Sequence, residues 1–197
     1  MQKIILASKS KNRSRILKTL GVSFKIIVSG FEETKIKEKN PKIRARKIAL
    51  AKAKKVAKKH QGIIISADTF TLCKGEILEK PKNLKEAKKM LKQISGNKTI
   101  CYTGFCFLNQ AKKIAFSKTA ITEVAFRKIY QKEIEKYVKA FPVTDWAAAY
   151  AASELYVLGI IKSVSGSLTG LTHGLPTEWL IPLLKKSGFE PKPFLLQ

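Results

Sequence analysis

The chain has 197 residues, of which 45% are hydrophobic, so it can bury an ordinary core as one large domain or two small lobes. No apolar run is long enough to span a membrane, and the apolar segment after Met1 is too short for a secretion signal. We therefore expect a cytoplasmic protein without a membrane segment. The formal net charge of +25 favours anionic partners, such as phosphate-bearing small molecules or nucleic acid.

The basic residues are mostly lysines: there are 34 lysines and five arginines. Proteins that recognise base sequence rely on arginine for bidentate contacts to guanine, so nucleic acid is expected only as a non-specific partner. A solvated lysine-rich surface is the simpler explanation of the charge, and it would still steer an anionic substrate inward. The three cysteines lack CxxC spacing and indicate free buried thiols, and the two distant histidines match no zinc site.

The first segment of the chain predicts an anion site. Residues 3–7 form a short apolar strand, and Ser10 is a suitable N-cap for a helix that ends at Leu20 before Gly21. Arg13 falls on the apolar stripe of this helix, in the first turn, where backbone N–H groups are free. A polar turn, a helix N-terminus and an inward arginine together suit an anion. The alternative is an arginine whose side chain runs along the surface.

A second strand is expected over residues 22–28, followed by the carboxylates Glu32 and Glu33, which are either site residues or part of a solvated loop. Asn40 and Pro41 then begin a helix that extends to about residue 60. Lys52 lies in the middle of its buried stripe, which indicates an ammonium that reaches a cleft. The other members of the stripe are Ala45, Ile48, Ala49, Ala53 and Val56.

The buried strand over residues 62–67 leads into Asp68, one of only two aspartates in the chain. A buried carboxylate is costly unless it is paired or binds a metal. We therefore expect Asp68 at the rim of the sheet, where ligands bind in open α/β folds, although an aspartate that caps a turn is the alternative. A hairpin about Lys74-Gly75 would bring Lys80 back near the end of this strand.

The remaining chain continues as alternating helices and strands. Asn83 and Glu86 begin a helix, and Asp145 precedes an alanine-rich segment whose small side chains indicate close approach of a ligand or simply tight packing. The other expected elements are strands over 98–109, 112–127 and 155–164, helices over 131–140 and after Pro176, and a loop over 165–174.

Short motifs along the chain, each weak alone, form an ordered set. The set resembles the Maf family of septum-formation-inhibitor-like nucleoside triphosphate pyrophosphatases, and the resemblance covers essentially the whole chain. The motifs are Leu6-Ala7-Ser8-Lys9-Ser10 with Arg13, Ser66-Ala67-Asp68-Thr69, Lys80-Pro81, Glu86-Ala87, Met90-Leu91, Ser95-Gly96, Tyr102-Thr103-Gly104 and Gly174-Leu175-Pro176.

The resemblance implies a fold and an activity. The implied fold is α/β, a twisted mixed central sheet in two lobes with a cleft, similar to the inosine triphosphatases; residues 1–197 would form this single domain, usually as a homodimer. The implied reaction is hydrolysis of a nucleoside triphosphate between the α- and β-phosphates, giving a monophosphate and pyrophosphate with Mg²⁺, in the house-cleaning of nucleotides. This is the chemistry of a hydrolase acting on acid anhydrides.

The resemblance also implies roles for individual residues. Asp68 would be the catalytic base that orients or deprotonates the attacking water. Charge-assisted hydrogen bonds of roughly 1.5–3 kcal/mol each would bind the triphosphate. The divalent cation, expected to be Mg²⁺, prefers oxygen ligands, and Glu32, Glu33 and Asp68 can supply them. The expected substrate-binding residues are Ser8, Ser10, Asn12, Arg13, Lys52, Thr69, Lys80 and Glu154.

Several positions depart from the family pattern and leave the base preference open. Asn12 stands where Arg is common, Thr99 where His is common and Trp146 where Lys is common. The usual Gln or Glu falls on Ser153, or on Glu154 with an insertion. Thr69 resembles the dTTP/UTP-type members of the family. Glu154 and the amino-acid sequence of residues 95–104 instead resemble the members that act on 7-methylguanosine triphosphate.

Two other functions are carried as alternatives. The first is an inactive Maf-like protein that binds nucleic acid through its basic surface, and the second is an enzyme that acts on another phosphorylated small molecule. A binding protein would have no need of Arg13, Lys52, Asp68 and Lys80 together, so the presence of this set favours the enzyme.

Overall fold

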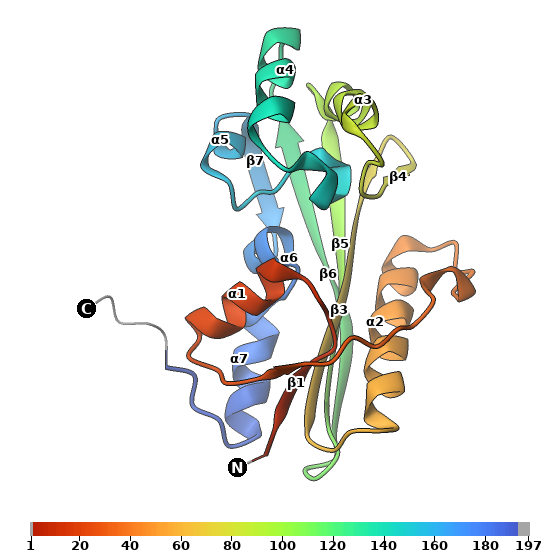
Figure 1. Ribbon diagram of the computed structural model, residues 1–197, viewed down its shortest axis with the longest axis vertical. Coiled ribbons are helices and arrows are strands. Elements are labelled where there is room, and N and C mark those ends of the chain that lie inside the picture. Colours follow the sequence, from red (N-terminus) through yellow and green to blue (C-terminus); the bar gives the residue numbers. More distant parts are fainter. Residues whose placement is uncertain (1, 193–197) are drawn as a thin grey trace. The chain divides into compact units, whose positions relative to one another are not determined.

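The computed structural model describes residues 2–192, in which helices and strands are interspersed along the chain (Figure 1). The chain divides into two compact units. Unit 1 comprises residues 2–68, 103–120 and 173–192, and unit 2 comprises residues 69–102 and 121–172. The strands β3 (Ile63–Cys73), β5 (Lys98–Asn109) and β6 (Ile114–Phe126) contribute residues to both units.

The other elements belong to one unit, except α6 (Leu168–His173), whose last residue falls in unit 1. Unit 1 holds β1 (Ile4–Leu6), α1 (Lys11–Thr19), β2 (Lys25–Ile26), the 3₁₀ turn η1 (Glu33–Lys35), α2 (Pro41–Ala57) and α7 (Thr177–Lys186). Unit 2 holds β4 (Glu76–Leu78), α3 (Leu84–Ile94), α4 (Gln131–Ala140), the 3₁₀ turns η2 (Val143–Asp145) and η3 (Ala147–Ala149), α5 (Leu155–Leu158) and β7 (Ile161–Gly166).

The sheet confirms the expected α/β class. Seven strands are found in residues 2–192, in the order β2-β1-β3-β5-β6-β7, with β4 paired to β3. The sheet is mixed: β1 pairs in parallel with β2 and β3, whereas β4 is antiparallel to β3 and β7 is antiparallel to β6. Leu6 pairs with Ile65 at the end of β1.

The core of unit 1 follows from strand alternation, because successive side chains of a strand point to opposite faces. One face of β1 and β3 packs against α1 and α7, and the other packs against α2 (Figure 1). The first face includes Ile4, Leu6, Ile63, Ile65 and Ala67 with Leu180 and Leu184, and the second includes Ile5, Ala7 and Ile64 with Ala49, Ala53 and Val56.

The predicted helix starts are confirmed by their caps. The Ser10 side chain accepts a hydrogen bond from Arg13 N, and the Asn40 side chain accepts one from Ile43 N. Asn83 caps α3 in the same way. Each cap satisfies a backbone N–H that has no partner within its own helix, which is why serine and asparagine are favoured at this position.

Three expected elements differ from the structure. The strand expected over 155–164 is correct for 161–164, which belong to β7, and wrong for 155–158, which form the short helix α5. The loop expected over 165–174 contains the end of β7 and helix α6. A short apolar run does not distinguish a buried strand from a buried helix. Of the strand expected over 22–28, only Lys25–Ile26 form β2, beside β1.

The alanine-rich segment after Asp145 is packed tightly in unit 2. Ala148 and Ala149 are fully buried and have left-handed backbone angles, with φ of 56° and 60°. The Ala148 N–H donates to the Glu79 carbonyl oxygen at 3.1 Å. Because both side chains are fully buried, a larger residue at either position would have to displace packed neighbours, which agrees with the tight-packing alternative.

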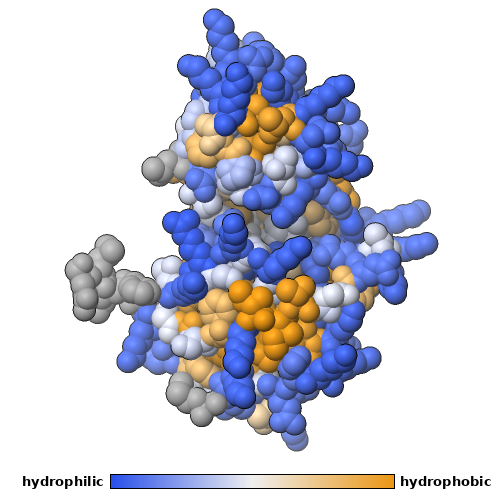
Figure 2. Space-filling model, viewed as in Figure 1, coloured by the Kyte–Doolittle hydropathy of each residue, from blue (hydrophilic) through white to orange (hydrophobic). Residues whose placement is uncertain are grey.

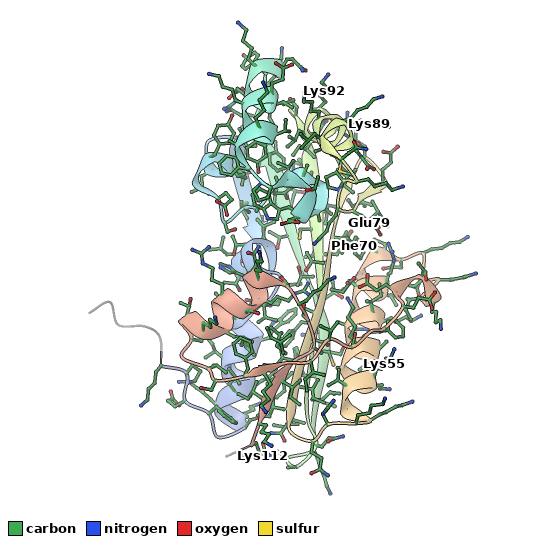
Figure 3. All side chains as sticks on the ribbon, viewed as in Figure 1. Lys55, Phe70, Glu79, Lys89, Lys92 and Lys112 are labelled. Atoms are coloured by element: carbon green, nitrogen blue, oxygen red, sulfur yellow. The ribbon has the colours of Figure 1, made fainter. Side chains whose placement is uncertain are left out.

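The surface agrees with the composition. Hydrophilic side chains cover most of the face shown in Figure 2, and Lys89 and Lys92 project outward from α3 (Figure 3). Within residues 2–192, the helices are too short or too polar to cross a bilayer.

Candidate active site

The centre of the candidate site is the ammonium group of Lys52, which contacts two carboxylates in unit 1. Lys52 Nζ lies 2.9 Å from Asp68 Oδ1 and 2.5 Å from Glu33 Oε1. The Lys52 and Asp68 side chains are only 12% and 10% exposed, whereas Glu33 is about half exposed. The predicted inward lysine is therefore confirmed, and its ammonium neutralises the buried carboxylate.

Strand alternation explains why Asp68 reaches Lys52. Asp68 follows Ile64 and Ser66 at two-residue spacing, and Ile64 packs on the α2 face of β3. Asp68 is not at a strand end as expected, because β3 continues to Cys73. The neighbouring strand β1 ends at Leu6, which pairs with Ile65, so Asp68 lies past the last residue of β3 that pairs with β1. Further along, β3 pairs with β4.

The start of α1 supplies a second group of polar atoms in unit 1. Arg13 Nη1 donates to Ser8 Oγ at 2.9 Å, and Arg13 Nε donates to the Gly174 carbonyl oxygen at 3.0 Å. The Ser10 backbone N–H also donates to Ser8 Oγ, at 3.2 Å. These bonds hold Arg13 across the turn between β1 and α1, rather than along the surface.

The charge of Arg13 interacts with the carboxylates that contact Lys52. Burial lowers the pKa of the Arg13 guanidinium from its ordinary value, and the negative charges of Asp68 and Glu33 oppose that shift. Arginine nevertheless stays protonated at neutral pH. Unit 1 thus holds two cations, Arg13 and Lys52, close to two carboxylates and to the N-terminus of α1, which is a suitable environment for a phosphate group.

The loop that carries Glu33 is tied to α2. Lys55 lies on the outer part of α2 (Figure 3), and its ammonium donates to the Gly30 carbonyl oxygen at 2.5 Å. Gly30 has a φ of 56°, the left-handed conformation that glycine adopts without strain. This contact holds the loop before η1 against α2, and the Lys52–Glu33 ion pair holds the start of η1 against the same helix.

The two carboxylates on Lys52 suit a divalent cation. Glu33 and Asp68 present oxygen atoms to one ammonium group, so they can also share one metal ion, and Mg²⁺ is commonly bound by one or two carboxylates with phosphate oxygens. Glu32 is placed elsewhere: it is 63% exposed and pairs with Lys35 at 3.1 Å. Residues 2–192 contain no cluster of three or more metal-ligating side chains.

The remaining predicted residues are distributed over both units. Asn12 is half-buried on α1 in unit 1. Thr69, Lys80 and Glu154 belong to unit 2, where Lys80 is exposed after β4 and Glu154 precedes α5. Their roles in the site stay predictions.

Two polar contacts were not anticipated from the sequence. The Ser66 hydroxyl donates to the Ala49 carbonyl oxygen at 2.6 Å, and the Gly174 carbonyl accepts from Arg13. A serine directly after three isoleucines was the available signal for the first contact. The second joins residues 161 positions apart, and no local pattern predicts such a contact.

Matches to known proteins identify the family of the chain. A family model described as "Maf-like protein" matches residues 3–187, so the chain belongs to the Maf-like protein family.

Similar curated proteins share one printed name, "dTTP/UTP pyrophosphatase". The protein of that name from Pyrococcus furiosus is 39% identical over 188 residues, covering 94% of this chain and 95% of the relative. The one from Methanococcoides burtonii is 36% identical, covering 95% and 96%, and the one from Syntrophus aciditrophicus is 33% identical, covering 95% and 91%.

Proposed function

We propose that this protein is a nucleoside triphosphate pyrophosphatase that cleaves the α–β phosphoanhydride bond. The observation that carries the proposal is the cluster in unit 1, where Lys52 bridges Asp68 and Glu33 near Arg13. The printed activity of the relatives, which this chain matches over nearly its whole length, supports it.

Arg13 and Lys52 would bind the triphosphate. Both are cations on the inner side of their helices, and the N-terminus of α1 adds backbone N–H groups beside them. Charge-assisted hydrogen bonds of roughly 1.5–3 kcal/mol each make such groups strong phosphate ligands. They also stabilise the negative charge that shifts to the leaving pyrophosphate, which is the larger part of catalysis in reactions of this class.

Asp68 would act on the attacking water. Its carboxylate oxygen accepts the proton while the water oxygen bonds to the α-phosphorus and the bond to the bridging oxygen of the β-phosphate breaks. A divalent cation held by Glu33 and Asp68 would supply charge neutralisation and Lewis acidity at the phosphates. Because Asp68 is only 7% exposed, the water that it orients would be separated from bulk solvent.

We further propose that dTTP and UTP are among the substrates. The relatives carry this activity in their printed names, and Thr69 resembles the corresponding type of family member. Glu154 resembles the 7-methylguanosine-triphosphate type, so a panel that includes methylated guanosine triphosphate discriminates between the two preferences.

The test measures which phosphate bond is cleaved. The protein is incubated with Mg²⁺ and a panel of standard and methylated nucleoside triphosphates, and pyrophosphate is quantified against orthophosphate. We expect pyrophosphate and a monophosphate, and a rate that falls about 10²–10⁴-fold in Asp68→Asn because a positioned base contributes this much. Asp145→Asn, at the only other aspartate, is the matched control and should retain activity.

The other outcomes are informative. Release of orthophosphate would move the reaction to a terminal phosphate and contradict the proposal. A folded protein without turnover on any triphosphate would favour the alternative of an inactive relative that binds nucleic acid through its lysines. In that case binding to DNA should weaken steeply with salt and be indifferent to sequence.

A further inference from the structure

We propose that Ser66 is a positioning residue that sets the place of α2 on the sheet and thereby directs Lys52 to Asp68. The inference rests on the proposed pyrophosphatase function and assigns a role to a side chain that does not contact the charged cluster. It starts from an unusual feature of β3, a fully buried hydroxyl in a strand that is otherwise apolar up to Asp68.

The Ser66 hydroxyl makes one defined bond. It donates to the Ala49 carbonyl oxygen at 2.6 Å, and both residues are fully buried. Within a helix this carbonyl already accepts the N–H of the residue four positions later, so the helix does not need the serine. A buried hydroxyl roughly breaks even in stability when it is bonded, whereas alanine would fill a strand position without that cost. What the bond adds is a directional link between β3 and one turn of α2.

That turn determines where Lys52 lies. Ala49 precedes Lys52 by three residues on α2, and Ser66 precedes Asp68 by two residues on β3, so the same two elements carry the hydrogen bond and the ion pair. Helical side chains lean toward the N-terminus of their helix, so the stem of Lys52 runs back across the turn that contains Ala49. A translation of α2 along its axis by the rise of one residue would move the ammonium by about 1.5 Å.

A second contact shows how close α2 lies to the sheet. A Cβ added to Gly104 of β5 would lie 2.0 Å from the Ala45 carbonyl oxygen, so the backbones of α2 and β5 touch there. Ala45 and Ala49 are one turn apart, and both are fully buried. Gly104 therefore sets how closely α2 approaches the sheet, and the Ser66 bond sets its position along the sheet. The Gly104–Ala45 contact limits only the distance between α2 and the sheet. The Ser66–Ala49 hydrogen bond is directional, so it also restricts where α2 lies along the sheet.

The experiment is a double-mutant cycle on single-turnover kinetics with excess enzyme. We expect Ser66→Ala to lower the rate of pyrophosphate release about tenfold, because small displacements of reacting groups are costly. In a Lys52→Met background the same change should lower the remaining rate less than about twofold, since Ser66 acts through Lys52. Ser66→Cys, with a weaker donor of similar size, should lie between serine and alanine.

Ser187→Ala is the matched control, because Ser187 is also buried in unit 1 and accepts a hydrogen bond from Asn109 Nδ2 at 3.0 Å. It should leave the rate unchanged. Equal losses from Ser66→Ala in both backgrounds would show a merely structural role and overturn the inference. A Ser66→Ala rate equal to wild type, with Asp68→Asn inactive, would overturn the inference while the function stands. An inert wild type would overturn both.

Discussion

Removal of the Lys52 ammonium should destabilise unit 1, because it leaves a buried carboxylate without its partner. Lys52→Met keeps an unbranched apolar side chain, one atom shorter, and removes the ammonium group with its charge and its N–H donors. The Nζ–Oδ1 distance of 2.9 Å corresponds to a Coulomb attraction of about 6 kcal/mol at an effective dielectric constant of about 20. Part of this attraction offsets the desolvation of both groups, and breaking one side of a buried pair costs about 3–5 kcal/mol.

We therefore expect Lys52→Met to lower the free energy of unfolding of unit 1 by about 3 kcal/mol. Asp68→Asn added to Lys52→Met removes the orphaned charge and should recover at least about 2 kcal/mol, since both groups of the pair are then neutral. The exposed partner Glu33 contributes little, because about half of its side chain lies in solvent.

The assay is urea denaturation followed by tryptophan fluorescence. Trp179 packs between Phe105 and Phe116 in unit 1, and Trp146 is the only other tryptophan, so in a Trp146→Phe background all tryptophan fluorescence comes from unit 1. The slope of the transition should be the same for all variants. A loss below about 1 kcal/mol in Lys52→Met would refute the reasoning, as would a double variant that loses the sum of both single effects.

Three further predictions follow from the packing and the electrostatics. Gly104→Ala should destabilise unit 1 by about 3 kcal/mol in urea titrations, because the new Cβ would lie 2.0 Å from the Ala45 carbonyl oxygen. Gly159→Ala is the control: its Cβ would lie 3.4 Å from the nearest atom, the Tyr156 carbonyl oxygen, so it should cost less than about 1 kcal/mol. Hydrogen bonds from Arg127 lower the pKa of Glu133 to about 2, so the stabilisation by this carboxylate is complete above about pH 4.5 and is lost as the pH falls toward 2. Glu133→Gln should accordingly cost about 1 kcal/mol at pH 7 and less at pH 3, and an equal cost at both would contradict this. All three cysteines are buried, and burial raises the pKa of the Cys106 thiol to about 12. A thiol reagent should therefore modify none of them in the native protein and all of them in urea. Fast labelling of the native protein would contradict this packing.

The sequence by itself determined the features that depend on neighbours in the chain. The caps Ser10, Asn40 and Asn83 begin helices because each accepts a hydrogen bond from a backbone N–H three residues later. The stripe of α2 predicted that Lys52 points inward, since helical periodicity alone assigns a residue to a face. The run of three isoleucines predicted a buried strand, and the ordered motifs predicted the family.

The tertiary structure alone decided which partners those side chains meet. Nothing local distinguishes Glu33, which contacts Lys52, from its neighbour Glu32, which pairs with Lys35; the path of the loop across α2 separates them. The extent of β3 beyond Asp68 depends on pairing with β4, and β7 begins where Ile161 meets Phe126. The ion pairs of Lys52 with Glu33 and Asp68 join segments that are separate in the chain, so their energies arise only when the loop, the sheet and α2 have come together.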